Sequence, residues 1–166
     1  VTITPSTGVD TSTTLSCSAT ATDADGDEPT VTYAWTNDSE GISLGSGSSV
    51  TLTTTNSSPG DTIVCTASAT DEDGGVGEAE ASISVDNTNP EITSVSIVPS
   101  IGVSSSTRLT CRATAVDADG DDPTFGYVWT NETLGDTLGT DSEVDLDPAY
   151  APVSYTHLRA HETVRN

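Results

Sequence analysis

The chain contains an internal repeat with a period of 94 residues. Adding 94 to a residue number carries Cys17 to Cys111 and Trp35 to Trp129, and the alignment needs no gap. Residues 1–52 share about 30 identical positions with their counterparts in this alignment. Self-similarity sets domain boundaries before any motif is considered, and a period of this length matches one small domain. The 166 residues are therefore expected to hold two copies of one module.

The connector between the two copies is predicted at residues 86–90, with the sequence Asp-Asn-Thr-Asn-Pro. It contains a proline and no glycine, which makes a short linker stiff. The first copy is expected to span 1–88 and the second 89–152. The second copy is predicted to lack its last strands, because the position equivalent to Cys65 is occupied by Arg159.

The register of the repeat fails after residue 152. Residues 153–166 contain both histidines of the chain and two of its arginines. The run Val-Ser-Tyr-Thr-His-Leu-Arg-Ala-His-Glu-Thr at 153–163 resembles the translated sequencing-adapter read-through found at the ends of metagenomic gene predictions. This resemblance implies a non-native tail at 153–166, which is set aside from the fold prediction.

Two histidines in this tail, His157 and His161, lie four residues apart. On a helix that spacing would place two imidazoles on one face, as in some zinc sites. Glu162 follows the second histidine, so the His-Glu-x-x-His order of a zinc protease is not formed. An artefactual tail is therefore preferred over a metal site or a chance helix.

Apolar and polar residues alternate in short runs along both copies. In residues 13–22, for example, Leu15 and Cys17 alternate with serines and threonines, which is the period of a half-buried strand. Further runs of this kind lie at residues 31–35, 50–52, 63–69 and 79–85. Between them stand Asp, Gly, Pro, Asn and Ser, which favour turns. The pattern predicts an all-β fold of tandem antiparallel β-sandwiches, the second one truncated.

The order Cys17, Trp35, Cys65 in the first copy resembles the immunoglobulin fold. In that fold two cysteines join the sheets across the core, and a tryptophan packs against the bridge. The resemblance implies Ig-like sandwiches with a Cys17–Cys65 disulfide. Closing a loop of this length would stabilise a thin core by roughly 4 kcal/mol in the chain-entropy model. Cys111 would remain a thiol, because the strand carrying its disulfide partner is missing; two buried thiols in a reducing compartment are the alternative for the first copy.

Acidic residues gather in the loops that follow the predicted strands. They are Asp23, Asp25, Asp27, Asp71 and Asp73 in the first copy, and Asp117, Asp119 and Asp121 in the second. In an Ig-like sandwich both acidic loops of the first copy lie at the same end, so their carboxylates are expected to converge. Carboxylates alternating along a turn suit Ca²⁺, and a cation relieves their mutual repulsion. The alternative is a solvated Asp-Gly turn that binds nothing.

The connector extends the calcium hypothesis. The acidic loop of the second copy is expected to face it, so that Asp86, Asn87 and Asn89 would complete an inter-domain Ca²⁺ site. The run at 21–27, followed by Tyr-x-Trp at 33–35, resembles bacterial Ig-like and PKD-type surface repeats. The Asp-x-Asp loops together with the connector resemble cadherin repeats, which implies calcium that stiffens tandem domains.

The charge excludes several classes of partner. There are 26 acidic residues against four Lys and Arg, giving a net charge of −22, so nucleic acid and anionic membrane surfaces would be repelled. No apolar run approaches the roughly 18 to 20 residues of a membrane span, and the start shows no signal-peptide pattern. Because the chain begins at Val1 and contains no Met, it is expected to be a piece of a longer protein.

Catalysis is not expected, since both histidines lie in the tail and neither copy offers a histidine base for a nucleophile. Trp35 and Trp129 are expected to pack in the core and not to stack on sugars. The predicted function is a structural or adhesive spacer of a secreted or cell-surface bacterial repeat protein, with Ca²⁺ as cofactor. Its predicted partners are neighbouring repeats and a surface glycan or protein. One alternative is an accessory polysaccharide-binding module of a secreted enzyme; another is that the acidity only serves halophilic solvation.

Overall fold

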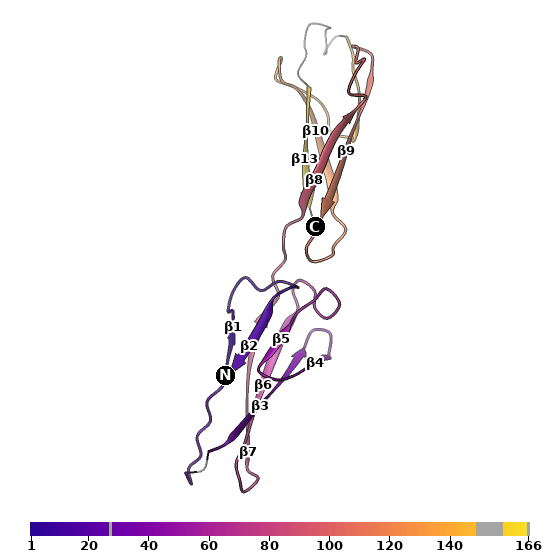
Figure 1. Ribbon diagram of the computed structural model, residues 1–166. Helices are drawn as coiled ribbons and strands as arrows, with labels where there is room; N and C mark the ends of the chain where they lie inside the picture. The colour runs from indigo at the N-terminus through magenta and orange to yellow at the C-terminus, as the bar shows by residue number, and fades with distance from the viewer. Residues whose placement is uncertain (27, 149–157, 166) are drawn as a thin grey trace. The chain divides into compact units, whose positions relative to one another are not determined.

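The computed structural model describes residues 1–26, 28–148 and 158–165, and throughout this part the chain forms strands and no helix (Figure 1). It divides into two compact units, Val1–Thr88 and Asn89–Asn166, called unit 1 and unit 2 below. All strand pairs are antiparallel. The prediction of an all-β chain with antiparallel sheets is confirmed. The described residues accordingly include no helix that could cross a membrane.

Unit 1 consists of a three-stranded and a four-stranded sheet (Figure 1). The first sheet has the order β1 (Thr2–Thr4), β2 (Thr14–Ser18) and β5 (Ser49–Thr51). The second has the order β4 (Ile42–Ser46), β3 (Thr30–Asn37), β6 (Thr62–Thr70) and β7 (Val76–Ser84).

The core of unit 1 lies between these two sheets. On β2, Leu15 and Cys17 are buried between exposed serines and threonines, as the alternating sequence requires. Trp35 on β3 and Ile63 on β6 reach the same apolar cluster from the opposite sheet, and both are fully buried. The cluster thus unites residues far apart in the sequence, which is what makes the two sheets one sandwich.

Unit 1 also contains a buried polar network around Asn37 and Asp61. The side-chain amide of Asn37 donates to Asp61 Oδ2 at 2.7 Å and to the carbonyl of Asn56 at 3.1 Å. The backbone N–H of Ser58 donates to the same Asp61 oxygen at 2.8 Å. Asn37 and Asp61 are both buried, so these bonds replace the water that the two side chains lose on folding.

Unit 2 contains two three-stranded sheets (Figure 1). The first has the order β12 (Glu143–Asp145), β9 (Arg108–Val116) and β8 (Glu91–Val98). The second has the order β11 (Asp136–Gly139), β10 (Thr124–Asn131) and β13 (Leu158–Arg165). Its buried cluster comprises Leu109, Cys111, Trp129, Val144 and Leu146.

The sequence repeat is preserved in the strands. β10 begins and ends 94 residues after β3, and β12 begins and ends 94 residues after β5. Trp35 and Trp129 occupy the same place in their strands, and each is fully buried. The two copies therefore share the central strand around which each core is built.

Strand β13 lies within residues 153–166, the predicted non-native tail. It pairs along the whole of β10, with Ala160 opposite Trp129, whereas in unit 1 Cys65 on β6 lies opposite Trp35. β13 thus takes the place of β6, shifted by one residue from the repeat, which would put Arg159 at that position. The strand belongs to the segment after residue 152, and the prediction that the second repeat, residues 89–152, lacks its own last strands stays a prediction.

The reason for the strand is local. Ala160 and Val164 are half-buried whereas Arg159 and Thr163 are exposed, which is the period of two that a strand requires. Ala160 packs against the core of unit 2, and Arg159 pairs with Glu132 at 2.9 Å. A strand conformation does not reveal the origin of a segment. The non-native origin of residues 153–166 therefore stays a prediction.

Candidate functional site

A disulfide joins the two sheets of unit 1. Cys17 on β2 is bonded to Cys65 on β6, with 6.5 Å between their Cα atoms, and both are buried against Trp35 in the same cluster. This confirms the predicted bridge over the alternative of two thiols. In unit 2, Cys111 on β9 is a buried thiol, and the residue facing Trp129 from the neighbouring strand is Ala160.

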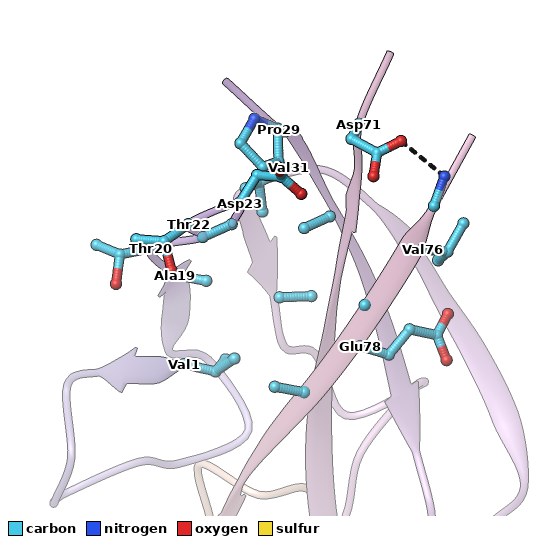
Figure 2. A pocket seen from close by; sticks show the side chains of 16 residues that line it. Val1, Ala19, Thr20, Thr22, Asp23, Pro29, Val31, Asp71, Val76 and Glu78 are labelled. Atoms are coloured by element: carbon cyan, nitrogen blue, oxygen red, sulfur yellow. Dashed lines mark hydrogen bonds between the residues drawn. The ribbon is translucent and has the colours of Figure 1, made fainter. Parts of the chain in front are cut away.

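Two of the predicted acidic ligands of unit 1, Asp23 and Asp71, close their own turns. Asp23 Oδ1 accepts from the backbone N–H of Asp25 at 2.7 Å. Asp71 Oδ1 accepts from the N–H of Gly75 at 2.7 Å, the bond drawn in Figure 2, and its own N–H donates to the carbonyl of Gly75. These are the turn-forming bonds that short acidic side chains make with nearby backbone.

The structure brings only some of the predicted ligands together. Asp23 and Asp71 line one groove from two different loops, as Figure 2 shows, whereas Asp25 and Asp73 are exposed and do not line it. Asp27 lies outside the described residues. Within the described ranges, no group of three or more His, Cys, Asp and Glu side chains is arranged to hold a metal ion.

The acidic loop of unit 2 differs from its counterpart in burial. Asp119 is 7% exposed, whereas the equivalent Asp25 of unit 1 is exposed. The N–H of Asp119 donates to Asp117 Oδ1 at 2.8 Å. Asp117 Oδ2 is buried, and among the described atoms it has no hydrogen-bond partner. Asp121 is exposed at the end of the same loop.

Of the connector residues, two make local bonds within unit 1. The N–H of Asp86 donates to the carbonyl of Val9 at 2.6 Å, and the side-chain amide of Asn87 donates to the carbonyl of Thr88 at 2.7 Å. Asn89 begins unit 2. The inter-domain calcium site involves both units, and it stays a prediction.

His161 belongs to strand β13, and His157 lies outside the described residues.

The electrostatics of the two units differ because unit 1 has no cationic side chain. Residues 1–88 contain no Lys, Arg or His, so none of their carboxylates has a side-chain counter-charge within that unit. The pKa of Asp10 is lowered chiefly by the backbone N–H of Ser12, and further by the hydroxyls of Ser12 and Thr13. In unit 2, a hydrogen bond from Arg108 lowers the pKa of Asp145, and the same guanidinium lies 3.2 Å from Glu143.

The groove in unit 1 has a volume of about 490 Å³. It is lined by Ala19–Asp23, by β7 residues from Val76 to Ala79, and by Val31, Ala67 and Ala69 of β3 and β6; Figure 2 shows Thr20 and Asp23 across from Val76 and Glu78. Val76 is 63% exposed at its edge. The groove is therefore lined by small apolar side chains together with threonines and the carboxylates of Asp23, Asp71 and Glu78.

Sequence reasoning missed the groove and the Asn37–Asp61 network. A signal for the network existed, because Asn37 recurs one period later as Asn131, which is also buried. No comparable sequence signal marks the groove, because the small residues that line it are of the same types as those in the other strands of this chain.

These features define an all-β protein of antiparallel sheets arranged as small sandwiches, the first closed by a disulfide. No family model, curated protein or solved structure matches the chain.

Proposed function

We propose that the chain is a structural or adhesive spacer of a secreted or cell-surface bacterial protein, built from tandem Ig-like repeats of the PKD-type class. The observation that carries this proposal is the repeated sandwich whose first copy has its sheets joined by a buried disulfide. Such a bond restricts extension of the chain and favours an oxidising compartment.

The strand order of unit 1 supports the Ig-like assignment. The bridge runs from β2 in one sheet to β6 in the other, and Trp35 stands on β3, next to β6. An immunoglobulin domain has the same relation between its two cysteine strands and its tryptophan strand. This agreement in core positions supports an Ig-like fold, and a spacer function requires in addition that the domain bears load.

A spacer has to bear load along the chain. When unit 1 is pulled from its ends, the disulfide prevents the 48-residue separation between Cys17 and Cys65 from opening. In single-molecule stretching we expect discrete unfolding events for the oxidised chain. Reductant should lengthen the extension released by unit 1 by about 170 Å, since an extended residue spans about 3.3–3.6 Å.

Featureless stretching at low force would contradict the spacer, because it would mean that the sandwiches bear no load. Retention of the chain on an insoluble polysaccharide would instead favour the accessory module of a secreted enzyme. Cys111→Ala is the matched control for the stretching experiment, since Cys111 forms no disulfide and its replacement should leave the reductant-dependent lengthening unchanged.

Calcium is the proposed stiffening ion, and the acidic loop of unit 2 is its best-supported place. A buried carboxylate oxygen such as Asp117 Oδ2 is costly without a bonding partner, and a bound cation would supply one. Asp117 and the buried Asp119 would hold the ion, with Asp121 next along the loop. Oxygen ligands of this kind are those that Ca²⁺ prefers.

Calcium is therefore expected to stabilise unit 2. If the site binds with a dissociation constant of about 100 μM, 10 mM Ca²⁺ adds roughly 2.7 kcal/mol to the free energy of unfolding. The measurement is thermal unfolding followed by the fluorescence of Trp129 in a Trp35→Phe background. NaCl at matched ionic strength should produce a much smaller rise; an equal rise would favour halophilic solvation.

Paired variants locate the ion. Asp117→Asn with Asp119→Asn should abolish the calcium response, because both carboxylates are lost while the turn keeps its side-chain acceptors. Asp23→Asn with Asp25→Asn makes the same change in unit 1 and is expected to leave the response of unit 2 intact. A response that survives in the first variant would show that this loop is not the binding site.

A further inference from the structure

The chain contains three Asp-Gly pairs, at residues 25–26, 73–74 and 119–120. This pair is a reactive sequence in any polypeptide, because glycine has no Cβ to keep its backbone nitrogen away from the side-chain carboxyl carbon of the preceding aspartate. The nitrogen can attack that carbon and close a five-membered succinimide ring. Each pair is therefore a candidate place for the backbone to rearrange to isoaspartate.

The repeat makes two of these pairs a matched comparison. Residues 23–27 and 117–121 have the same sequence, Asp-Ala-Asp-Gly-Asp. Their glycines also have similar backbone conformations, with φ of 98° at Gly26 and 86° at Gly120. A difference in reactivity between the two pairs must then come from the folded surroundings of each loop and not from the neighbouring residues in the sequence.

The folded surroundings differ in exposure and in hydrogen bonding. Asp25 is exposed, whereas Asp119 is buried. The N–H of Gly120 donates to the carbonyl of Asp117 at 3.4 Å, and within the described ranges the N–H of Gly26 bonds to no acceptor. A buried carboxyl is shielded from the water that the reaction releases and consumes, and a bonded N–H has to leave its acceptor before the nitrogen attacks. Both differences favour reaction at Asp25.

The third pair lies in a turn that several hydrogen bonds close. The N–H of Gly74 donates to the carbonyl of Asp71 at 3.4 Å, and the N–H of Gly75 donates to Asp71 Oδ1 at 2.7 Å. Asp73 is exposed, but these bonds restrain the glycine that follows it. We expect its reactivity to lie between those of the other two pairs.

We propose that Asp25 is the preferred site of spontaneous isoaspartate formation in the folded protein. The backbone nitrogen of Gly26 attacks Cγ of the protonated Asp25 carboxyl; the N–Cγ bond forms, the nitrogen loses its proton, and one carboxyl oxygen leaves as water. Water then adds to the main-chain carbonyl carbon of Asp25 and breaks its bond to the same nitrogen. The chain now runs through Cβ and Cγ, and the former main-chain carbonyl is a carboxylate.

This rearrangement changes the acidic loop without changing its composition. The backbone gains one atom at residue 25, and the net reaction consumes no reagent, because the water released in the first step is returned in the second. The N–H of Asp25 donates to Asp23 Oδ1 at 2.7 Å and closes the turn just before the rearranged bond. The modified loop therefore carries the carboxylate of residue 25 on a shorter side chain and a longer backbone.

The test incubates the oxidised full chain at near-neutral pH with a chelator and follows isoaspartate with time. After reduction, a glutamate-specific protease places the three pairs in separate peptides, which end at Glu40, Glu78 and Glu132. Liquid chromatography separates the isomers, and electron-based fragmentation identifies them. Isoaspartate at residue 25 is expected to form about tenfold or more faster than at residue 119, because the buried pair reacts only when its loop opens.

Variants and denaturant provide the controls. Asp25→Glu keeps the charge but would need a less favourable six-membered ring, so it should remove the isomer from the peptide that ends at Glu40. Asp119→Glu is the matched change and should leave that isomer unchanged. In denaturant with reductant, the two identical loop sequences should react at equal rates.

Equal rates at residues 25 and 119 in the folded chain would overturn the proposal, as would the absence of isoaspartate at residue 25. A difference that persisted in denaturant would also overturn it, since the fold would then not be its cause. The chelator removes calcium and no load is applied, so these outcomes are independent of the proposed spacer function.

Discussion

Replacing Trp35 with alanine is expected to lower the free energy of unfolding of unit 1 by about 3–5 kcal/mol. Trp35 is fully buried and packs in the cluster that contains the Cys17–Cys65 bridge. Its indole N–H donates to the carbonyl of Gly47 at 2.9 Å. Truncation therefore leaves a large cavity between the sheets and removes a hydrogen bond. A loss of this size is a large share of the about 5–15 kcal/mol that stabilises a typical domain.

The two tryptophans provide the measurement and its control. Each unit contains one, so in the Trp35→Ala variant the fluorescence of Trp129 reports on unit 2 alone, and hydrogen exchange of β6 reports on unit 1. Trp129→Ala is the matched change, because its indole N–H donates to the carbonyl of Asp141 at 2.9 Å. Trp129→Ala should destabilise unit 2 and leave the hydrogen exchange of β6 unchanged. Unchanged exchange in β6 of Trp35→Ala would contradict the central role of this side chain.

Removing the disulfide of unit 1 is expected to cost about 4 kcal/mol when Cys17 and Cys65 are both replaced by alanine. The bond spans a sequence separation of 48 residues, and opening it restores the freedom of that loop mainly to the unfolded chain. Denaturant unfolding in a Trp129→Phe background, followed by Trp35 fluorescence, measures the change in unit 1.

Unit 2 supplies the control for this prediction. Reductant should shift the unfolding of unit 1 in the unmodified chain and leave unit 2 unchanged, because Cys111 is a thiol. Cys111→Ala should likewise leave the midpoint of unit 1 where it is. If neither reductant nor the double replacement lowered the unfolding midpoint of unit 1, the bridge would contribute nothing to the stability of this unit.

Several parts of the fold follow from local sequence patterns. The alternation around Leu15 and Cys17 predicts β2, and the repeat carries β3 onto β10 without a gap. The disulfide was predicted by resemblance to the immunoglobulin pattern, and the structure places both cysteines in the same core. Such features are predictable because strand periodicity and repeats are properties of neighbouring or aligned residues.

Strand β13 could not be predicted by the same means. The repeat places Arg159 opposite Trp129, whereas the structure places Ala160 there, and the sequence of this segment departs from that of the first copy. Pairing with β10 satisfies backbone groups irrespective of side-chain identity, so a segment of unrelated sequence can occupy this place. Its short alternation at Ala160 and Val164 was the available signal.

By itself the sequence determined the all-β class, the two copies and the residues that build each core, because these depend on period two and on repetition. Only the tertiary structure decided which carboxylates lie together, that Asp119 is buried while Asp25 is exposed, and that a groove opens beside Val1. The physical reason is that burial depends on strands distant along the chain. Identical loop residues therefore acquire different surroundings in the two units.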